Sequence, residues 1–507
     1  MIVLYNPLST TPGKQPLPLS IMALAAVLDT HDAPARLGAW PTPPAPGRWT
    51  LVDGNVISDP AAEIVSRLSA APPSELRLLA VTVMPGPQLT QAVRVCRAVH
   101  DALPQARVVW GGYFPTQHTD TVLRSPFVDF VVRSQGEQPL LHLLEALRGE
   151  RPFEMVGSLS WKRGGGIVHN PAGTMTPLDE LPDLPYHRVE MRDYIHPTYL
   201  GRRTVAHSSS FGCPFACSFC AVVAMSNRRW LAQSPARLHG VIDHLVREYG
   251  IDAVQMHDMD FFISEARTAE FAQRIAPLGV SWWGLGRVDT LMQYSDATWR
   301  KMARSGLKMV FSGAESSSDA VLATMNKGGK ASAALALELA ARMRAYGVVP
   351  EYSFVLGSPP DPLGDMAQTF EFIRRIKRVN PSTEIILYTY TPVPMDGTLY
   401  AEASRLGFAF PSTLDEWASE EWRQVMMRRG EGLPWFDGTV RRRVRDFERV
   451  LNAFYPTITD RRLTPARRAL LKMVSGWRYA LRLYGAPYEL RALHRLMHYQ
   501  RPETTGF

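Results

Sequence analysis

Short apolar runs alternate with amphipathic helical patterns twice along this chain of 507 residues, and that alternation restricts its fold most. A short apolar run followed by a helical pattern predicts a strand with a crossover helix, and repeats of this unit build a parallel sheet. A chain of this length exceeds what one hydrophobic core normally organises, so two or three domains are expected. The predicted fold class is α/β.

The first series occupies residues 1–150. It predicts strands at residues 1–7, 49–57, 76–86, 106–112 and 127–137, with helices at residues 19–28 and 88–103. Such a series predicts a doubly wound, Rossmann-like parallel sheet, which binds ligands at the carboxyl ends of its strands. A connector at residues 151–195 follows, and residues 158–170 within it are similar to a small β-hairpin.

The second series occupies residues 196–400. Its predicted strands are residues 204–210, 253–262, 281–287, 309–316, 351–359 and 384–392, and its helices are residues 236–250, 266–279, 295–306, 332–347 and 364–379. Six strands joined by crossover helices predict a partial (β/α)6 barrel. Residues 401–507 carry mostly helical patterns and are expected to form a helical C-terminal region.

The composition is that of a globular protein. Hydrophobic residues make up 46% of the chain and charged residues 21%, which excludes a disordered chain or a coiled coil. No apolar run reaches the roughly 18 residues that a membrane-spanning helix needs. The first residues lack the basic start and the cleavage site of a signal peptide, so a cytoplasmic protein is expected.

Three of the four cysteines, Cys213, Cys217 and Cys220, lie within eight residues in the pattern CxxxCxxC. A disulfide framework would spread its cysteines along the chain, whereas clustered thiols indicate a metal or iron–sulfur site. Three thiolates can hold three irons of a 4Fe–4S cluster and leave the fourth iron open. The alternative is a structural zinc site, which needs a fourth ligand. The histidines nearest in sequence are His207, His239 and His257.

The cysteine motif, with Phe219 before its last cysteine, resembles that of the radical S-adenosylmethionine (SAM) enzymes. The resemblance implies a 4Fe–4S cluster on Cys213, Cys217 and Cys220. It also implies that SAM binds the open iron and is cleaved to a 5′-deoxyadenosyl radical, with an electron from an external one-electron reductant.

Later segments are similar to the SAM-contacting motifs of this family. The resemblance implies that Asp258 or Asp260 meets the SAM amino group, and that Arg287 lies near its carboxylate. The remaining implied contacts are Phe219, Glu315, Ser316 and Gly357, the last with Pro359 near adenine. Each motif also has a structural interpretation: turn acids for the aspartates, a surface ion pair for Arg287 and a helix N-terminal charge for Glu315.

Residues 1–150 are similar to the cobalamin-binding domain that precedes the barrel in the cobalamin-dependent (class B) branch. The implied cobalamin contacts are Gly86, Gln88, Gly111, Gly112, Gly136 and Glu137. Glycine after a strand lets the backbone approach a corrin ring closely. The domain contains no DxHxxG loop, and His100 and His118 are expected to be solvated or structural. The alternative is a vestigial sheet that only packs on the barrel.

The resemblance implies an enzyme, and a C-methyltransferase is the leading hypothesis. It would act on an unactivated carbon of a small molecule through a 5′-deoxyadenosyl radical and methylcobalamin. Residues 111–116 and 133–137 are similar to the anaerobic magnesium-protoporphyrin ester cyclase, so oxidative cyclisation or rearrangement is the alternative. An alternative of another class is a non-catalytic cobalamin- or redox-responsive binding protein.

The basic charge is concentrated near the C-terminus. Residues 441–501 contain fifteen Arg or Lys against four Asp or Glu, a net charge of +11, although the whole chain carries only +8. Such a pattern usually indicates a solvated helical face. Residues 469–485 also suit peripheral contact with anionic lipid, which would favour a hydrophobic substrate. No nucleic-acid partner is expected, because no recognised binding module is present.

Overall fold

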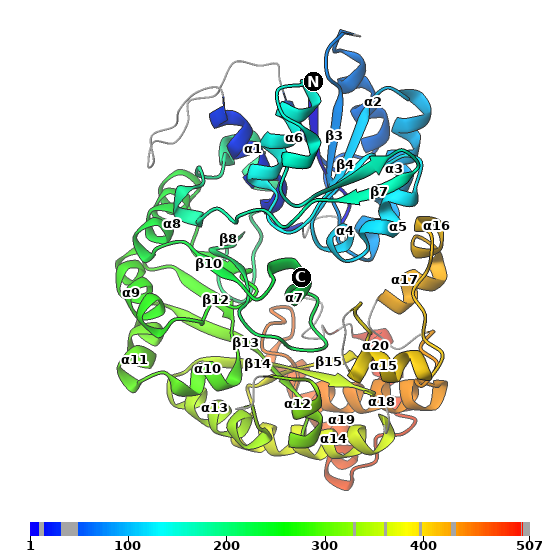
Figure 1. The fold of residues 1–507 in the computed structure, drawn as a ribbon. Coiled ribbons are helices and arrows are strands. Elements are labelled where there is room, and N and C mark those ends of the chain that lie inside the picture. The colour runs from blue at the N-terminus through cyan, green and yellow to red at the C-terminus, as the bar shows by residue number, and fades with distance from the viewer. Residues whose placement is uncertain are drawn as a thin grey trace.

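The computed structural model describes residues 1–9, 15–31, 49–72, 74–327, 331–358, 362–394, 398–426, 432–497 and 499. Within this part of the chain, helices flank two large sheets, one of seven strands with a parallel core and one of six parallel strands, and further helices follow them (Figure 1). The predicted α/β class is confirmed. No helix among the described residues has both the length and the apolar character needed to cross a membrane.

The first sheet has seven strands in the order β2-β1-β3-β4-β5-β6-β7. Its strands are β1 (Ile2–Asn6), β2 (Trp49–Asp53), β3 (Leu78–Thr82), β4 (Arg107–Gly111), β5 (Phe130–Val132), β6 (Leu159–Arg163) and β7 (Gly166–His169). The first five are parallel in a doubly wound order. The predicted hairpin is confirmed as β6 and β7, which pair antiparallel and extend the sheet beyond β5.

Helices cover both faces of this sheet. They are α1 (Leu19–His31), α2 (Pro60–Ser69), α3 (Pro87–Ala102), α4 (Tyr113–Gln117), α5 (Thr119–Arg124) and α6 (Glu137–Leu147). Successive residues of a strand point to opposite faces. Val3 therefore packs in the core under α2 and α3, whereas Leu4 packs in the core under α1 and α6.

The second sheet has six parallel strands that neighbour one another in chain order. They are β8 (Thr204–His207), β11 (Ala253–Met256), β12 (Ser281–Leu285), β13 (Leu307–Glu315), β14 (Val349–Leu356) and β15 (Glu384–Thr389). The helices between them are α8 (Pro235–Tyr249), α9 (Glu265–Ile275), α10 (Val288–Gln293), α11 (Asp296–Arg304), α12 (Asp319–Thr324), α13 (Ala333–Ala345) and α14 (Pro362–Val379). The expected six strands with crossover helices are thus present, with β8 and β15 at the two edges.

One predicted strand, residues 204–210, is broken in the structure. Strand β8 ends at His207, and β9 (Ser210–Gly212) leaves the sheet to pair antiparallel with β10 (Trp230–Ala232). The break has a polar cause, because the buried Asp258 accepts hydrogen bonds from Ser209 N at 3.1 Å and Ser209 Oγ at 2.7 Å. The apolar pattern alone does not encode this contact.

The connector ties the first sheet to the second. It contains four short 3₁₀ turns at Phe153–Met155, Leu178–Glu180, Tyr186–Arg188 and Met191–Asp193. After the last turn, the Tyr194 hydroxyl donates to Asp53 Oδ2 at 2.6 Å, at the carboxyl end of β2. Arg188 pairs with Asp29 of α1 at 2.8 Å. These polar contacts hold the connector against the first sheet.

The C-terminal helices contact both parts of the chain, as Figure 1 shows. They are α15 (Thr398–Arg405), α16 (Leu414–Trp417), α17 (Glu420–Met426), α18 (Gly438–Phe454), α19 (Pro465–Leu481) and α20 (Tyr488–Leu496). Trp417 of α16 lies 4.6 Å from the ring of His118 in the first domain. Phe447 of α18 stacks on Phe370 of α14 at 3.7 Å. The expected helical region therefore bridges the two sheets.

His118 has a structural role, which is one of the two roles expected for it. Its ring packs against Phe114, Phe410 and Trp417, and burial lowers its pKa to about 4. The imidazole is therefore neutral at physiological pH. Cys96 lies on α3 as expected, where it accepts a hydrogen bond from Trp110 Nε1 at 3.3 Å.

Tyr194→Phe tests the connector contact. The substitution removes the hydroxyl that donates to the buried Asp53, and the free energy of unfolding should fall by about 1–3 kcal/mol, because a buried acceptor loses a partner. Urea denaturation followed by circular dichroism measures the change. Tyr199→Phe is the control, since Tyr199 lies in a nearby loop and is exposed. Equal stability of the two variants would contradict the proposed coupling.

Candidate cofactor site

The three cysteines lie in a loop between β9 and α7 (Val222–Ser226). Gly212 introduces this loop with a φ of 81°, and a side chain there would collide with the Arg229 carbonyl oxygen. Two hydrogen bonds fix the loop to the segment after α12. Ser218 N donates to Met325 O at 3.0 Å, and Asn326 Nδ2 donates to Ala216 O at 2.9 Å. These two bonds fix the position of the loop beside the second sheet.

Arg287, directly after β12, contacts the middle cysteine. Its Nη1 donates to Cys217 Sγ at 3.2 Å, and its guanidinium lies 3.9 Å from the centre of the Phe215 ring. Asp289 holds the guanidinium through two bonds of 3.0 and 2.7 Å, a bidentate arrangement that fixes its plane. Arg287 and Asp289 are both buried, so the alternative of a surface ion pair is wrong.

Lys327 forms a second buried ion pair beside the loop. Its Nζ lies 3.0 Å from Glu315 Oε1 and donates to Gly313 O at 2.6 Å. Glu315 has a φ of 62°, and its carboxylate folds back over Gly313, where a side chain would collide with it. Lys327 was not predicted as a site residue. It belongs to no motif, so the sequence offers no signal for it.

Cys213 and Cys217 are both at least partly buried, but they differ in the charges that lie near them. Burial raises the pKa of Cys213 to about 12. Burial also raises the pKa of Cys217, but the nearby cations Lys327 and Arg287 act in the opposite direction. Metal ligation requires the thiolate, and a neighbouring cation favours that form. Lys327 and Arg287, the cations of the two ion pairs, therefore favour the thiolate form of Cys217.

The two candidate aspartates differ in what they contact. Both oxygens of Asp258 accept hydrogen bonds from Ser209, so this residue has a structural role. Asp260 Oδ1 accepts from Phe262 N at 3.1 Å, whereas its buried Oδ2 has no hydrogen-bond partner among the described residues. Burial raises the pKa of Asp260 to about 7. A buried carboxylate oxygen without a partner fits a bound cationic group.

The donor set fits a cluster better than a single zinc ion. Among the described residues, no three His, Cys, Asp or Glu side chains are grouped to hold one metal ion. A 4Fe–4S cluster does not require such convergence, because each thiolate binds a different iron. His207 uses both ring nitrogens within the protein, toward Tyr186 at 3.4 Å and Gln233 at 3.3 Å.

The other residues predicted to contact SAM lie farther from the three cysteines in sequence or make contacts of their own within the protein. Ser316 Oγ donates to Asp365 Oδ1 at 3.0 Å. Gly357 has a φ of 76° and lies against the ring of Phe436, while its carbonyl accepts from Trp435 Nε1 at 2.9 Å. Phe219 is half-buried against the main core, and Pro359 lies outside the described residues. The structure thus brings Arg287 to the cysteine loop and places Gly357 against the segment that precedes α18.

The predicted cobalamin contacts lie at the carboxyl edge of the first sheet. Gly111 ends β4, and Gly112 has a φ of 94°. A Cβ at Gly112 would lie 3.1 Å from Thr82 Oγ1 and 3.3 Å from Val83 N. Gly86 precedes α3 with a φ of 91°, and a Cβ there would meet nothing within 4 Å. Open space at a strand edge suits a broad planar ligand.

Gln88 and Glu137 are polar members of this edge. Gln88 Oε1 accepts from Met84 N at 3.0 Å, and its Nε2 donates to Asn6 Oδ1 at 3.2 Å. Gln88 therefore braces the loop after β3 against the end of β1. Glu137 follows Gly136 at the start of α6, and burial raises its pKa.

The two candidate sites face each other. Helix α4 follows β4 of the first sheet, α7 follows the cysteine loop, and the two helices contact each other. Gln117 Nε2 of α4 lies 3.5 Å from Ala221 O, one residue beyond Cys220. In Figure 1 the carboxyl edge of the first sheet points toward α7. A cofactor at that edge would therefore lie close to the cysteine loop.

Several curated relatives match about half of the chain, two of which are described here, and no family model matches it. An uncharacterized methyltransferase of Pyrococcus horikoshii is 27% identical over 273 residues, 53% of this chain and 58% of that protein. The anaerobic magnesium-protoporphyrin IX monomethyl ester cyclase of Synechocystis sp. is 28% identical over 245 residues, 47% of this chain and 48% of that protein. The chain spans about half the length of these relatives.

Solved structures match over most of the chain. The cobalamin-dependent SAM radical enzyme OxsB, with aqua-cobalamin and SAM bound, superposes with a TM-score of 0.60 at 17% identity, covering 84% of this chain and 56% of that one. The radical SAM methyltransferase TsrM from Kitasatospora setae, with cobalamin and a [4Fe-4S] cluster bound, gives 0.60 at 15% identity, covering 80% and 74%. The resemblance is thereby confirmed at the level of the fold: this chain has the fold of the cobalamin-dependent radical SAM enzymes.

Proposed function

We propose that this chain is a cobalamin-dependent radical SAM enzyme that methylates an unactivated carbon of a small-molecule substrate. One observation carries the proposal: the three-cysteine loop, seated by Arg287, lies beside the glycine-lined carboxyl edge of the first sheet. The likeness to OxsB and TsrM and the match to a methyltransferase support it. An external one-electron reductant is required, and the cytoplasm supplies such reductants.

Cys213, Cys217 and Cys220 would hold the 4Fe–4S cluster, with SAM beside it and cobalamin on the first sheet. When bound, these groups supply an electron to SAM, a radical that removes hydrogen from carbon, and a methyl group for transfer. The role of the protein is to hold the cofactors and keep water from the reacting atoms.

Individual side chains have separate tasks in this proposal. Of the two candidate aspartates, Asp260 would offer its buried Oδ2 to the SAM amino group, because both oxygens of Asp258 already accept from Ser209. Arg287 positions Cys217 and stays fixed because Asp289 holds two of its nitrogens. Glu315 is oriented by Lys327 and Ser353 at the end of β13, where its carboxylate lies next to the cysteine loop.

Oxidative cyclisation is the second candidate, since the Synechocystis cyclase matches with nearly the same identity as the methyltransferase. The two candidates differ in what happens to SAM without substrate. A methyltransferase that uses cobalamin would take its methyl group from SAM and would therefore leave S-adenosylhomocysteine as the second product. A cyclase has no need of that transfer.

A single-turnover assay distinguishes these functions. The anaerobically reconstituted protein, reduced in the presence of SAM, should release S-adenosylhomocysteine in an amount equal to its bound corrinoid. Liquid chromatography with mass spectrometry measures this product together with 5′-deoxyadenosine. Formation of 5′-deoxyadenosine without S-adenosylhomocysteine would favour cyclisation. Absence of both products would favour a non-catalytic binding protein.

Each of the three loop cysteines should be required for the cluster. Cys213→Ala, Cys217→Ala and Cys220→Ala should each reduce the iron content from about four per chain to near zero, because a cluster loses one of its three protein ligands. Iron and sulfide analysis with the visible spectrum measures the loss. Cys96→Ala is the matched control and should keep its iron, since Cys96 is buried on α3 away from the loop. Retention of iron in the loop variants would contradict the proposal.

Gly111→Val tests the cobalamin edge. A Cβ at Gly111 would lie 3.6 Å from the Val132 carbonyl oxygen, an ordinary contact, so the fold should tolerate valine. The added methyl groups should obstruct a corrin ring, and corrinoid bound after reconstitution should fall about tenfold. The control is Gly240→Val on α8, where a Cβ would meet nothing within 4 Å. Equal corrinoid in both variants would refute the assignment, while iron content should stay unchanged in both.

A further inference from the structure

Helix α19 exposes a row of apolar side chains on one face. The row consists of Leu470, Met473, Trp477 and Leu481, which are 39%, 72%, 50% and 64% exposed. Their spacing of three or four residues places them on the same side of a helix. The opposite side of α19 is buried against α18, where Tyr479 stacks on Phe454 at 4.5 Å. The packing of this chain therefore leaves the row facing outward.

One basic side chain contacts this apolar row, since the Arg478 guanidinium lies 4.8 Å from the centre of the Trp477 ring. Lys472 lies on the packed side of α19, with its ammonium 5.5 Å from the centre of the Phe454 ring. Exposed apolar residues continue beyond the helix at Leu483 and Tyr488. A helix with an exposed apolar face, an exposed tryptophan and flanking arginines has the composition of one that lies in a membrane interface.

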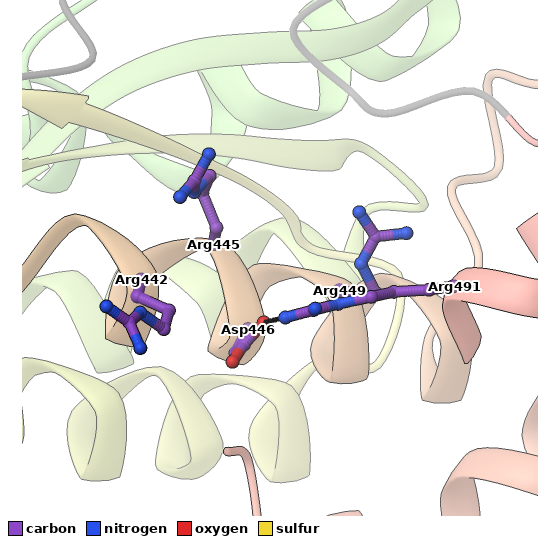
Figure 2. A pocket seen from close by; sticks show the side chains of 5 residues that line it. All are labelled: Arg442, Arg445, Asp446, Arg449 and Arg491. Carbon is purple, nitrogen blue, oxygen red and sulfur yellow. Dashed lines mark hydrogen bonds and ion pairs between the residues drawn. The ribbon is translucent and has the colours of Figure 1, made fainter. Parts of the chain in front are cut away.

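A cavity lined by arginines lies between α18 and α20 (Figure 2). Its volume is about 210 Å³, and its lining consists of Arg442, Arg445, Asp446, Arg449 and Arg491. The carboxylate of Asp446 is bound to Arg491 at 2.8 Å and to Ala486 N at 3.0 Å. Figure 2 shows Arg445 and Arg449 extending from α18 away from that carboxylate. Four guanidinium groups with one carboxylate give the cavity a strong positive charge, which suits a phosphate group.

The apolar row and the arginine cavity belong to one packed unit. Arg478 of α19 forms an ion pair with Glu489 of α20, and Arg491 follows two residues later. The exposed ring of Tyr488 lies 5.3 Å from the guanidinium of Arg491. Helix α20 therefore connects the exposed aromatic surface to the cavity.

We propose that α18, α19 and α20 form a docking surface for an anionic lipid bilayer. The apolar row of α19 enters the interface between headgroups and acyl chains, and the arginine cavity receives a lipid phosphate. Charge complementarity selects this occupant, because residues 441–501 carry a net charge of +11. A surface with both basic and exposed apolar side chains gains electrostatic attraction and apolar burial from such a bilayer. The proposal does not depend on the proposed chemistry.

Vesicle flotation tests the apolar row. The full chain should float with vesicles of phosphatidylcholine and phosphatidylglycerol, and much less with phosphatidylcholine alone. Met473→Glu combined with Trp477→Glu should weaken binding to the mixed vesicles about tenfold or more. Met155→Glu is the matched control, because Met155 is 64% exposed in the first part of the chain. Unchanged binding of the double variant, or equal binding to both vesicles, would overturn the proposal.

Charge reversal tests the cavity. Arg442→Glu combined with Arg445→Glu should weaken binding to the mixed vesicles about thirtyfold or more, because each of the two lost basic residues contributes roughly 1 kcal/mol near an anionic surface. Arg304→Glu, at an exposed arginine of α11, is the control.

Calorimetry with inorganic phosphate distinguishes a free anion from a headgroup: phosphate binding without flotation of the wild type would overturn the bilayer proposal. Sedimentation should show the same mass for the wild type and the Met473 variant, and dissociation of a dimer would instead assign the row to self-association.

High salt provides a test that needs no variant. Flotation of the wild type should decrease steeply as the salt concentration rises, since screening weakens attraction between exposed charges. Binding that does not change with salt would contradict the electrostatic part of the proposal. Circular dichroism and iron content establish that the variants keep the fold.

Discussion

A parallel strand can return to its sheet only through a crossover, so every loop that follows a strand lies at the same edge. All the predicted cofactor contacts depend on this constraint. Gly86, Gly112 and Glu137 are far apart in sequence but follow β3, β4 and β5 of the first sheet. The same rule places Arg287 and Glu315 at one edge of the second sheet. The contact between α4 and α7 then brings the two edges together.

The elements of both sheets could be predicted because their signals are local. Each strand is a short apolar run, and the alternation of strands and helices determines that they are parallel. The cysteine spacing and the order of later motifs were enough to identify the fold, which the comparison with OxsB and TsrM confirms. Composition alone also located the basic segment at residues 441–501.

Contacts between distant segments could not be predicted in this way. The break after His207 depends on Asp258, some fifty residues later, which accepts hydrogen bonds from Ser209. The pattern of apolar residues cannot predict that a distant side chain will accept a hydrogen bond from a backbone N–H. Lys327 gains its place only because the segment after α12 packs on the cysteine loop. The packing of Trp417 on His118 likewise joins residues about three hundred positions apart. Such contacts arise from tertiary packing, which local propensity does not determine.

Charge balance explains why two ion pairs lie beside the thiols. Arg287 is neutralised by Asp289, and Lys327 by Glu315, so neither buried cation carries an unpaired charge. Each cation nevertheless remains close enough to lower the pKa of Cys217 against the effect of burial. Asp260 is the exception, because burial raises its pKa and one of its oxygens has no hydrogen-bond partner in the part of the chain that the structure describes. A cationic amino group is the ligand that would remove this penalty, and the proposed function gives that role to the amino group of SAM.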